Sequence, residues 1–80
     1  MAVELKLQAI SDEMEYGTIA RWLKGEGDNV TAGEVVVEVE AEKVTTEIDA
    51  PVTGVLERIV AAEGDEIRVG ATIAVFVESS

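Results

Sequence analysis

The sequence contains no cysteine and no histidine in its 80 residues. A domain of this size buries only a modest core, and disulfides or structural zinc are common supplements. Neither is open to this chain, so its stability has to come from packing. The same absences remove the usual zinc ligands and the Ser-His or Cys-His pairs of nucleophilic catalysis. Paired carboxylates such as Glu13 and Glu15 have no expected pocket. We therefore predict no metal site and no catalytic residues.

Basic residues are also scarce, with 6 against 17 acidic residues and a net charge of −11. Nucleic acids and anionic membranes bind basic surfaces, so we expect neither as a partner. The acidic surplus is either a solvated face that keeps the protein in solution or a means of steering toward a positively charged partner. No apolar run approaches the roughly 20 residues of a membrane helix, and the first residues lack a signal-peptide pattern. We expect a cytoplasmic domain, or a mitochondrial-matrix one in a eukaryote.

Aromatic residues number only three, namely Tyr16, Trp22 and Phe76. Because 48% of the chain is hydrophobic, the chain is not disordered, and its core must be largely aliphatic. We expect Trp22 and Phe76 to fill this core, with Trp22 partly at the surface. Helical periodicity is weak. Period-two patterns predict strands near 3–8, 17–24, 35–41, 44–49, 54–61 and 72–78, with short pieces around Val30 and Ile67 that we expect to pair locally. Many short strands separated by glycines predict a small all-β sandwich or barrel.

The chain also repeats itself at an offset of 37 residues. Residues 17–42 align with 54–79, matching Gly17 with Gly54, Gly33 with Gly70, and Glu26-Gly27-Asp28 with Glu63-Gly64-Asp65. Matching glycines indicate matching backbone geometry. We expect Asp28 and Asp65 to cap backbone donors in equivalent turns. Two copies are too few for a solenoid, so the repeat predicts two similar halves packed face to face about a pseudo-twofold axis.

The stretch EVEAEKVTTEIDAP, residues 38–51, places Lys43 between two strand-like runs. Only Ala41, Glu42 and Lys43 remain to reverse the chain. The first copy of the repeat ends at this hairpin, and the second ends at the chain terminus. We therefore expect the hairpin at one extremity of the sandwich and the termini near the other. A lysine in a turn is commonly just a solvated residue, so the pattern indicates display of Lys43 without naming a chemistry.

Three motifs, GTIARWLKGEGDNVTAGE, VEVEAEKVTTEIDAPVTG and EGDEIRVGATIAV, follow one another between residues 17 and 75. In this combination the chain resembles the lipoyl domain of the acyltransferase component of 2-oxo acid dehydrogenase complexes. The resemblance implies an all-β fold, a flattened barrel or sandwich of two four-stranded antiparallel sheets with pseudo-twofold symmetry. It implies that lipoic acid is amide-linked to Lys43, which Glu42 and Val44 flank. It also implies that Gly33 and Gly54 lie on either side as structural glycines.

The function implied by the resemblance is that of a non-catalytic swinging-arm carrier. Such a domain takes an acyl group from a thiamin-diphosphate-dependent 2-oxo acid decarboxylase and passes it to coenzyme A at the acyltransferase core. Dihydrolipoyl dehydrogenase then reoxidises the arm, and a separate enzyme attaches lipoate. Glu40, Glu42, Glu47 and the loop 9–16 are candidate partner contacts, unless they are ordinary surface charge. We expect residues 1–78 to form a monomeric domain, with 79–80 starting a linker or ending a fragment.

The chain also departs from the family pattern. The family tip is most often Asp-Lys-Ala, whereas this chain has Glu42-Lys43-Val44, and it lacks a proline that often follows the first strand. These changes leave open which complex is served. One alternative is a biotinyl carrier, although its lysine is typically flanked by methionines. A glycine-cleavage lipoyl carrier is less consistent, because those proteins are longer and carry helices. An unmodified β-sandwich that mediates assembly is the alternative from another functional class.

Overall fold

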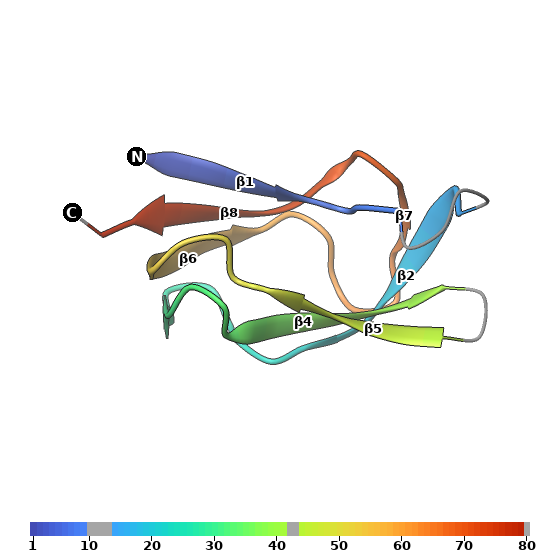
Figure 1. Ribbon diagram of the computed structural model, residues 1–80, viewed down its shortest axis with the longest axis horizontal. Coiled ribbons are helices and arrows are strands. Elements are labelled where there is room, and N and C mark those ends of the chain that lie inside the picture. Colours follow the sequence, from blue (N-terminus) through green and yellow to red (C-terminus); the bar gives the residue numbers. More distant parts are fainter. Residues whose placement is uncertain (10–13, 42–43, 80) are drawn as a thin grey trace.

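A computed structural model describes residues 1–9, 14–41 and 44–79, and these residues form a β-sandwich (Figure 1). No helix in this part of the chain is long and apolar enough to cross a membrane. Alternating buried and exposed residues drive the strand formation, as the sequence predicted. The strands are β1 (Ala2–Lys6), β2 (Tyr16–Trp22), β3 (Asn29–Val30), β4 (Val35–Ala41), β5 (Val44–Asp49), β6 (Gly54–Ile59), β7 (Glu66–Arg68) and β8 (Thr72–Glu78).

The strands form two four-stranded antiparallel sheets, ordered β1-β8-β6-β3 and β5-β4-β2-β7. Within the described residues the two sheets stay separate, so a sandwich describes the fold better than a closed barrel. Each copy of the repeat supplies three strands, β2 to β4 from the first and β6 to β8 from the second. The prediction that the pieces around Val30 and Ile67 pair locally is wrong, because β3 pairs with the distant strand β6 and β7 pairs with the distant strand β2. Each half therefore gives one strand to the sheet of the other half.

The repeat extends to the backbone geometry. Gly27 and Gly64 have φ values of 91° and 90°, and Gly33 and Gly70 have 89° and 94°. The register shifts between Ile19 and Arg21 in β2 and at the equivalent place, between Leu56 and Arg58, in β6.

The predicted aspartate caps are confirmed. The Gly25 amide donates to Asp28 Oδ2 at 2.8 Å, and the Ala62 amide donates to Asp65 Oδ2 at 2.9 Å.

Two glutamates tie the halves together in a reciprocal way. Next to the bulge in β2, the Trp22 amide donates to Glu63 Oε2 at 2.9 Å. In the other half the Ile59 amide donates to Glu26 Oε2 at 2.8 Å. A bulge interrupts the ladder of backbone hydrogen bonds, so a nearby amide needs another acceptor. Each copy supplies that acceptor to the other, which makes the two-copy sequence one folding unit.

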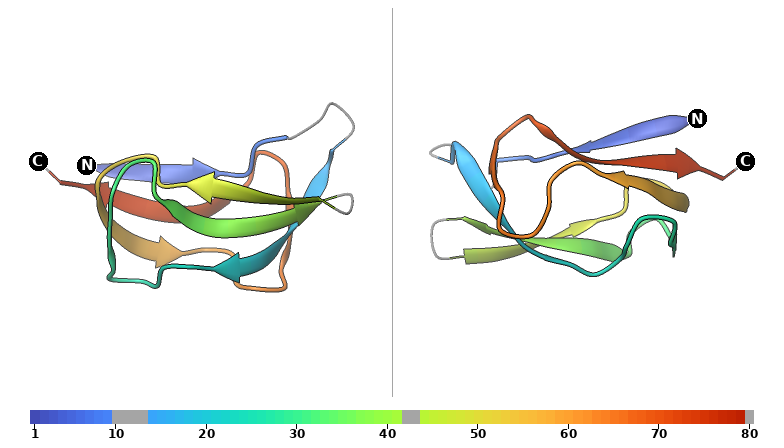
Figure 2. Two further views of the ribbon diagram at one scale, coloured as in Figure 1. Left: turned by 60° about the horizontal axis from the view of Figure 1, so that its bottom comes forward. Right: turned by 180° about the vertical axis from the view of Figure 1, so that it is seen from behind.

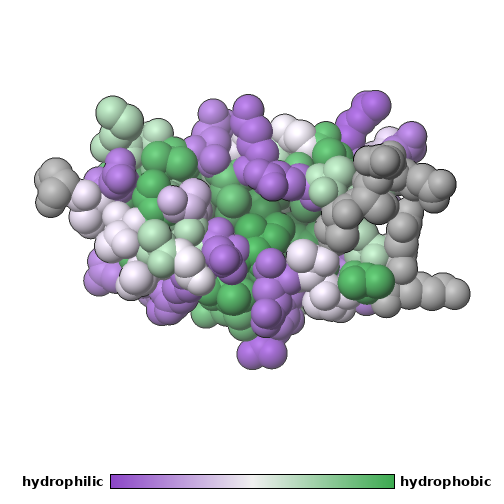
Figure 3. Space-filling view, viewed as in Figure 1, coloured by the Kyte–Doolittle hydropathy of each residue, from purple (hydrophilic) through white to green (hydrophobic). Residues whose placement is uncertain are grey.

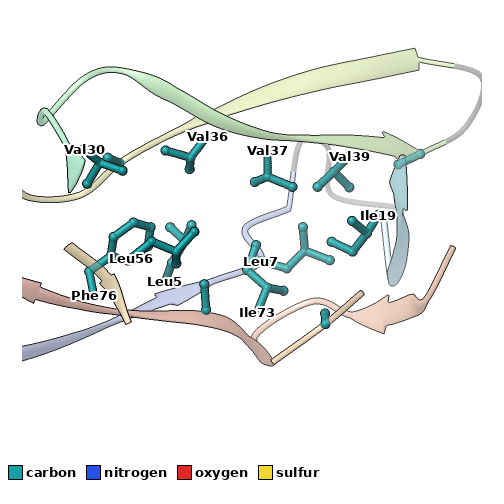
Figure 4. Close-up of a cluster of buried hydrophobic side chains, with 14 of the residues drawn as sticks. Leu5, Leu7, Ile19, Val30, Val36, Val37, Val39, Leu56, Ile73 and Phe76 are labelled. Carbon is teal, nitrogen blue, oxygen red and sulfur yellow. The ribbon is translucent and has the colours of Figure 1, made fainter. Parts of the chain in front are cut away.

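The core lies between the sheets and is largely aliphatic, as the sequence predicted, and Phe76 is fully buried in it. Figure 4 shows Val36, Val37 and Val39 of β4 facing the side chains of the opposite sheet. Val36 and Val37 are consecutive and both buried, because the register shifts between Val35 and Val37. Trp22 packs partly buried against this core, and its indole Nε1 donates to the Ala61 carbonyl at 2.8 Å.

The molecule is elongated, with extents of 37 × 19 × 19 Å. The start of β1 and the end of β8 lie at one end of the long axis, and the end of β4 and the start of β5 lie at the other (Figures 1 and 2). The sequence predicted this arrangement from the two ends of the repeat. A segment at the hairpin end is therefore held far from the point where any adjoining chain would connect.

Candidate functional site

The β4–β5 hairpin builds the candidate site. The two strands stay paired along their whole length, from Val35 opposite Asp49 to Ala41 opposite Val44. The inward side chains Val37, Val39 and Ala41 are buried, so β4 is anchored in the core up to its last residue. Val44, on the other strand at the same level, is 55% exposed. The paired strands thus end together at the extremity of the sandwich.

The predicted attachment residue Lys43 and its neighbour Glu42 lie outside the described residues. The residues on either side of them are described: Ala41 ends β4 and Val44 begins β5. These two residues are the last cross-strand pair before the reversal. A two-residue connection between paired strands is typical of a tight β-hairpin. The sequence prediction that strands flank this dipeptide directly is therefore confirmed.

The two predicted structural glycines, Gly33 and Gly54, lie at the terminal end of the sandwich, away from the hairpin tip. Gly33 adopts a positive φ, and its amide donates to the Ala50 carbonyl at 3.1 Å, which closes the base of the hairpin. Gly54 has a different requirement. A Cβ at Gly54 would overlap the carbonyl oxygen of Val77 on β8. Gly54 therefore permits close approach of two strands, whereas Gly33 permits a turn.

Two of the predicted acidic contacts, Glu40 and Glu47, lie on the outer face of the β5-β4-β2-β7 sheet, and the third, Glu42, lies outside the described residues. Glu38 lies directly opposite Glu47, and Glu40 lies opposite Thr45. On its other side Glu38 faces Arg21 of β2. Like charges directly opposite each other destabilise a sheet. Glu40 and Glu47 belong to successive same-face pairs of this register, so they lie near each other on one surface, and their role as partner contacts stays a prediction.

The predicted partner loop 9–16 is described only in part, because residues 10–13 lie outside the described residues. Its last residue, Tyr16, begins β2 and pairs with Arg68 of β7. Met14 is buried rather than presented to a partner. Arg68 was not predicted as a site residue. The pairing of β2 with β7 brings it here from 52 positions along the chain, and local sequence patterns carry no signal for such long-range pairing.

A groove of about 450 Å³ opens between the edge strands β1 and β5. Leu5 and Leu7 line it from one sheet, and Val39 and Ile48 line it from the other. Figure 3 shows hydrophobic atoms between hydrophilic rims in the middle of this face. The sequence analysis missed the groove, because it forms where edge strands of the two sheets, far apart in the sequence, face each other.

Comparison with known proteins agrees with this geometry. A family profile for biotin and lipoyl domains, described as "Biotin-requiring enzyme", matches residues 3–76. The chain is 44% identical over 77 residues to the dihydrolipoyllysine-residue succinyltransferase component of the 2-oxoglutarate dehydrogenase complex of Staphylococcus saprophyticus. It is 50% identical over 76 residues to dihydrolipoyllysine-residue acetyltransferase component 3 of the mitochondrial pyruvate dehydrogenase complex of Arabidopsis thaliana. These matches cover 96% and 94% of this chain but only 18% and 14% of the relatives.

A solved structure is similar over its full length. The lipoyl domain of the 2-oxoglutarate dehydrogenase complex from Azotobacter vinelandii superposes with a TM-score of 0.82 at 31% identity. The superposition covers 98% of this chain and 99% of that domain. The chain therefore corresponds in extent to one such domain and to a small part of the longer acyltransferase relatives.

Proposed function

The chain belongs to the biotin- and lipoyl-attachment family, and from this membership we propose that it is a lipoyl carrier domain with Lys43 as the attachment residue. The family covers both biotin and lipoate, and the names of the acyltransferase relatives favour lipoate. The observation that carries the proposal is the pairing of β4 and β5 as far as Ala41 and Val44, which leaves only Glu42 and Lys43 between the two strands in the sequence.

The hairpin suits a covalently attached arm. An amide link requires one lysine amine that an attaching enzyme can reach, and Val44, the described residue that follows Lys43 in the chain, is exposed. When bound, the lipoyl group supplies a disulfide that is reduced as an acyl group is taken up. The buried residues of β4 hold the base of the arm against the core. A rigid base with a flexible arm raises the effective concentration of the arm at nearby active sites, on the order of mM for short linkages.

The proposed partners are those implied by this role. They are the thiamin-diphosphate-dependent decarboxylase, the acyltransferase core, dihydrolipoyl dehydrogenase and the lipoate-attaching enzyme. The reactions belong to these partners, and the domain, a monomer of the cytoplasm or mitochondrial matrix, carries the group between them. The acyl group is acetyl or succinyl in this proposal, because acyltransferases named for each acyl group match at similar identity.

The experiment is attachment of lipoate by a purified lipoate ligase, followed by intact-mass measurement. The wild-type domain is expected to gain roughly 188 Da and the Lys43→Arg variant to gain nothing, because a guanidinium stays protonated and is a poor amide acceptor. Lys6→Arg, which changes an exposed lysine of β1, is the matched control and is expected to be modified at the wild-type rate. Modification of Lys43→Arg would contradict the proposal. Attachment of biotin instead, by a biotin ligase, would favour the biotinyl alternative, and no modification by either enzyme would favour an assembly module.

A further inference from the structure

The pseudo-twofold relation makes the two ends of the sandwich directly comparable. At the hairpin end, Tyr16 of β2 pairs with Arg68 of β7. An offset of 37 residues places Thr53 and Thr31 at the equivalent positions near the termini. These two threonines lie close together, since the amide of Ala32, next to Thr31, donates to Thr53 Oγ1 at 2.9 Å. At the equivalent positions of the other half the fold therefore carries two small polar residues, so the tyrosine and arginine are particular to the hairpin end.

Tyr16 and Arg68 lie on the outer face of their sheet at its hairpin end. Thr18 pairs with Glu40, and β4 ends one residue later, so Tyr16 lies toward the end at which β4 meets β5. Side chains alternate along a strand, which puts Tyr16 on the same face as Thr18 and Arg68 on the same face as Glu66. Both side chains are exposed.

Tyr16 is also the one strongly exposed aromatic side chain among the three in the chain. It is 48% exposed, whereas Phe76 is fully buried and Trp22 is packed partly buried against the core. Tyrosine and arginine are the types most enriched, with tryptophan, among residues that dominate binding energies at protein interfaces. Here they are adjacent, on rigid strands, beside the hairpin.

We propose that Tyr16 and Arg68 together form a contact site for the enzyme that loads the acyl group. The partner surface would offer a carboxylate to the Arg68 guanidinium and an apolar or aromatic pocket to the Tyr16 ring. This inference rests on the proposed function of the domain as a lipoyl carrier. The acyl-loading enzyme is the partner chosen because it is the one that must differ between an acetyl and a succinyl carrier. Attachment and reoxidation of the arm are the same chemistry for both.

The test replaces each residue with the threonine that the chain itself uses at the equivalent position. Lipoylated wild type, Tyr16→Thr, Arg68→Thr and the double variant are offered to purified pyruvate and 2-oxoglutarate decarboxylase components from the source cell. We expect the kcat/KM for acylation by the better enzyme to fall about fivefold or more in each single variant and about 30-fold or more in the double variant. Tyr16→Phe keeps the ring and is expected to retain most of the rate.

Two controls separate a contact role from net charge and from folding. Arg58→Thr removes one positive charge from the outer face of the other sheet and is expected to leave acylation unchanged. Lipoylation by the ligase, reoxidation by dihydrolipoyl dehydrogenase and the thermal midpoint are expected to stay near wild type in all variants. Acylation of the double variant at the wild-type rate would overturn this inference but not the proposed function. Equal losses of rate in acylation, lipoylation and reoxidation would do the same. A wild-type domain that takes no lipoate would overturn the proposed function and this inference with it.

Discussion

The outer faces of the two sheets differ in chemistry at positions that the repeat makes equivalent. Glu38 and Glu40 of β4 correspond to Val75 and Val77 of β8. The inner positions do not differ in this way, because both copies place buried apolar residues there. Examples are Ile19 with Leu56, Val36 with Ile73, and Val39 with Phe76. The core and turns of the two halves are thus held to one pattern, whereas the surfaces are free to diverge. The surface residues that differ between the two halves on the hairpin side are therefore the candidates for a functional role.

Among equivalent positions of the two halves, we expect the largest loss of stability on substitution at the glycine pair Gly17 and Gly54. A Cβ at Gly54 would overlap the Val77 carbonyl oxygen and lie 2.9 Å from the Ser79 nitrogen, and both are backbone atoms. A Cβ at Gly17 would lie 2.8 Å from Val39 Cγ1, which belongs to a side chain that can shift. We expect Gly54→Ala to lower the free energy of unfolding by at least about 3 kcal/mol and Gly17→Ala by about 1–2 kcal/mol.

Urea unfolding of the two variants measures this difference. Equal losses would mean that the strands at Gly54 separate as readily as the Val39 side chain moves, and the two sites would then be equivalent in energy as well as in position. A smaller loss at Gly54 than at Gly17 would contradict the close approach of β6 and β8 itself.

Much of this architecture was predictable from the sequence. The strands 35–41, 44–49 and 72–78 were predicted at their observed bounds, because alternation of apolar residues is a local signal. The first strand ends at Lys6 rather than residue 8, since its register shifts between Leu5 and Lys6. The exchange of β3 and β7 between sheets and the meeting of Tyr16 with Arg68 were not predicted. Both depend on pairing between distant segments, which a local period does not encode.

The second prediction concerns Gly33 and Gly70, which should behave alike. Both have a positive φ, near 90°, and a Cβ at either would meet no atom within 4 Å. The cost of a side chain there is therefore backbone strain alone. We expect Gly33→Ala and Gly70→Ala each to lower the free energy of unfolding by about 1–2 kcal/mol. Asparagine, which tolerates this conformation better, is expected to cost less at both sites. Losses that differ by more than about 0.5 kcal/mol between the two alanine variants would break the pseudo-symmetry of these turns.

The smallest effect is expected where the outer faces diverge, at the opposed pair Glu38 and Glu47. The equivalent of Glu38 in the other sheet is Val75, whose cross-strand partner is Glu4, so no like charges face each other there. Glu47→Gln keeps the size of the side chain and removes one of the two facing charges. We expect it to raise the free energy of unfolding by about 0.2–1 kcal/mol at low salt.

Removing any acidic charge relieves some repulsion in a chain of net charge −11. The repulsion between Glu38 and Glu47 therefore has to be separated from this repulsion of the whole chain. Glu57→Gln is the matched control, because Glu57 is an exposed strand residue of the other sheet, at the bulge between Leu56 and Arg58 and outside the paired register. The gain of Glu47→Gln over Glu57→Gln should shrink as salt is raised toward 1 M, since the screening length falls to roughly 3 Å. Equal gains in both variants at every salt concentration would show that Glu38 and Glu47 do not repel each other specifically. A persistent excess at low salt would show that this face retains a destabilising charge pair beside the hairpin. Stability would not select such a pair, so its physical reason would be either solubility or contact with a positively charged partner.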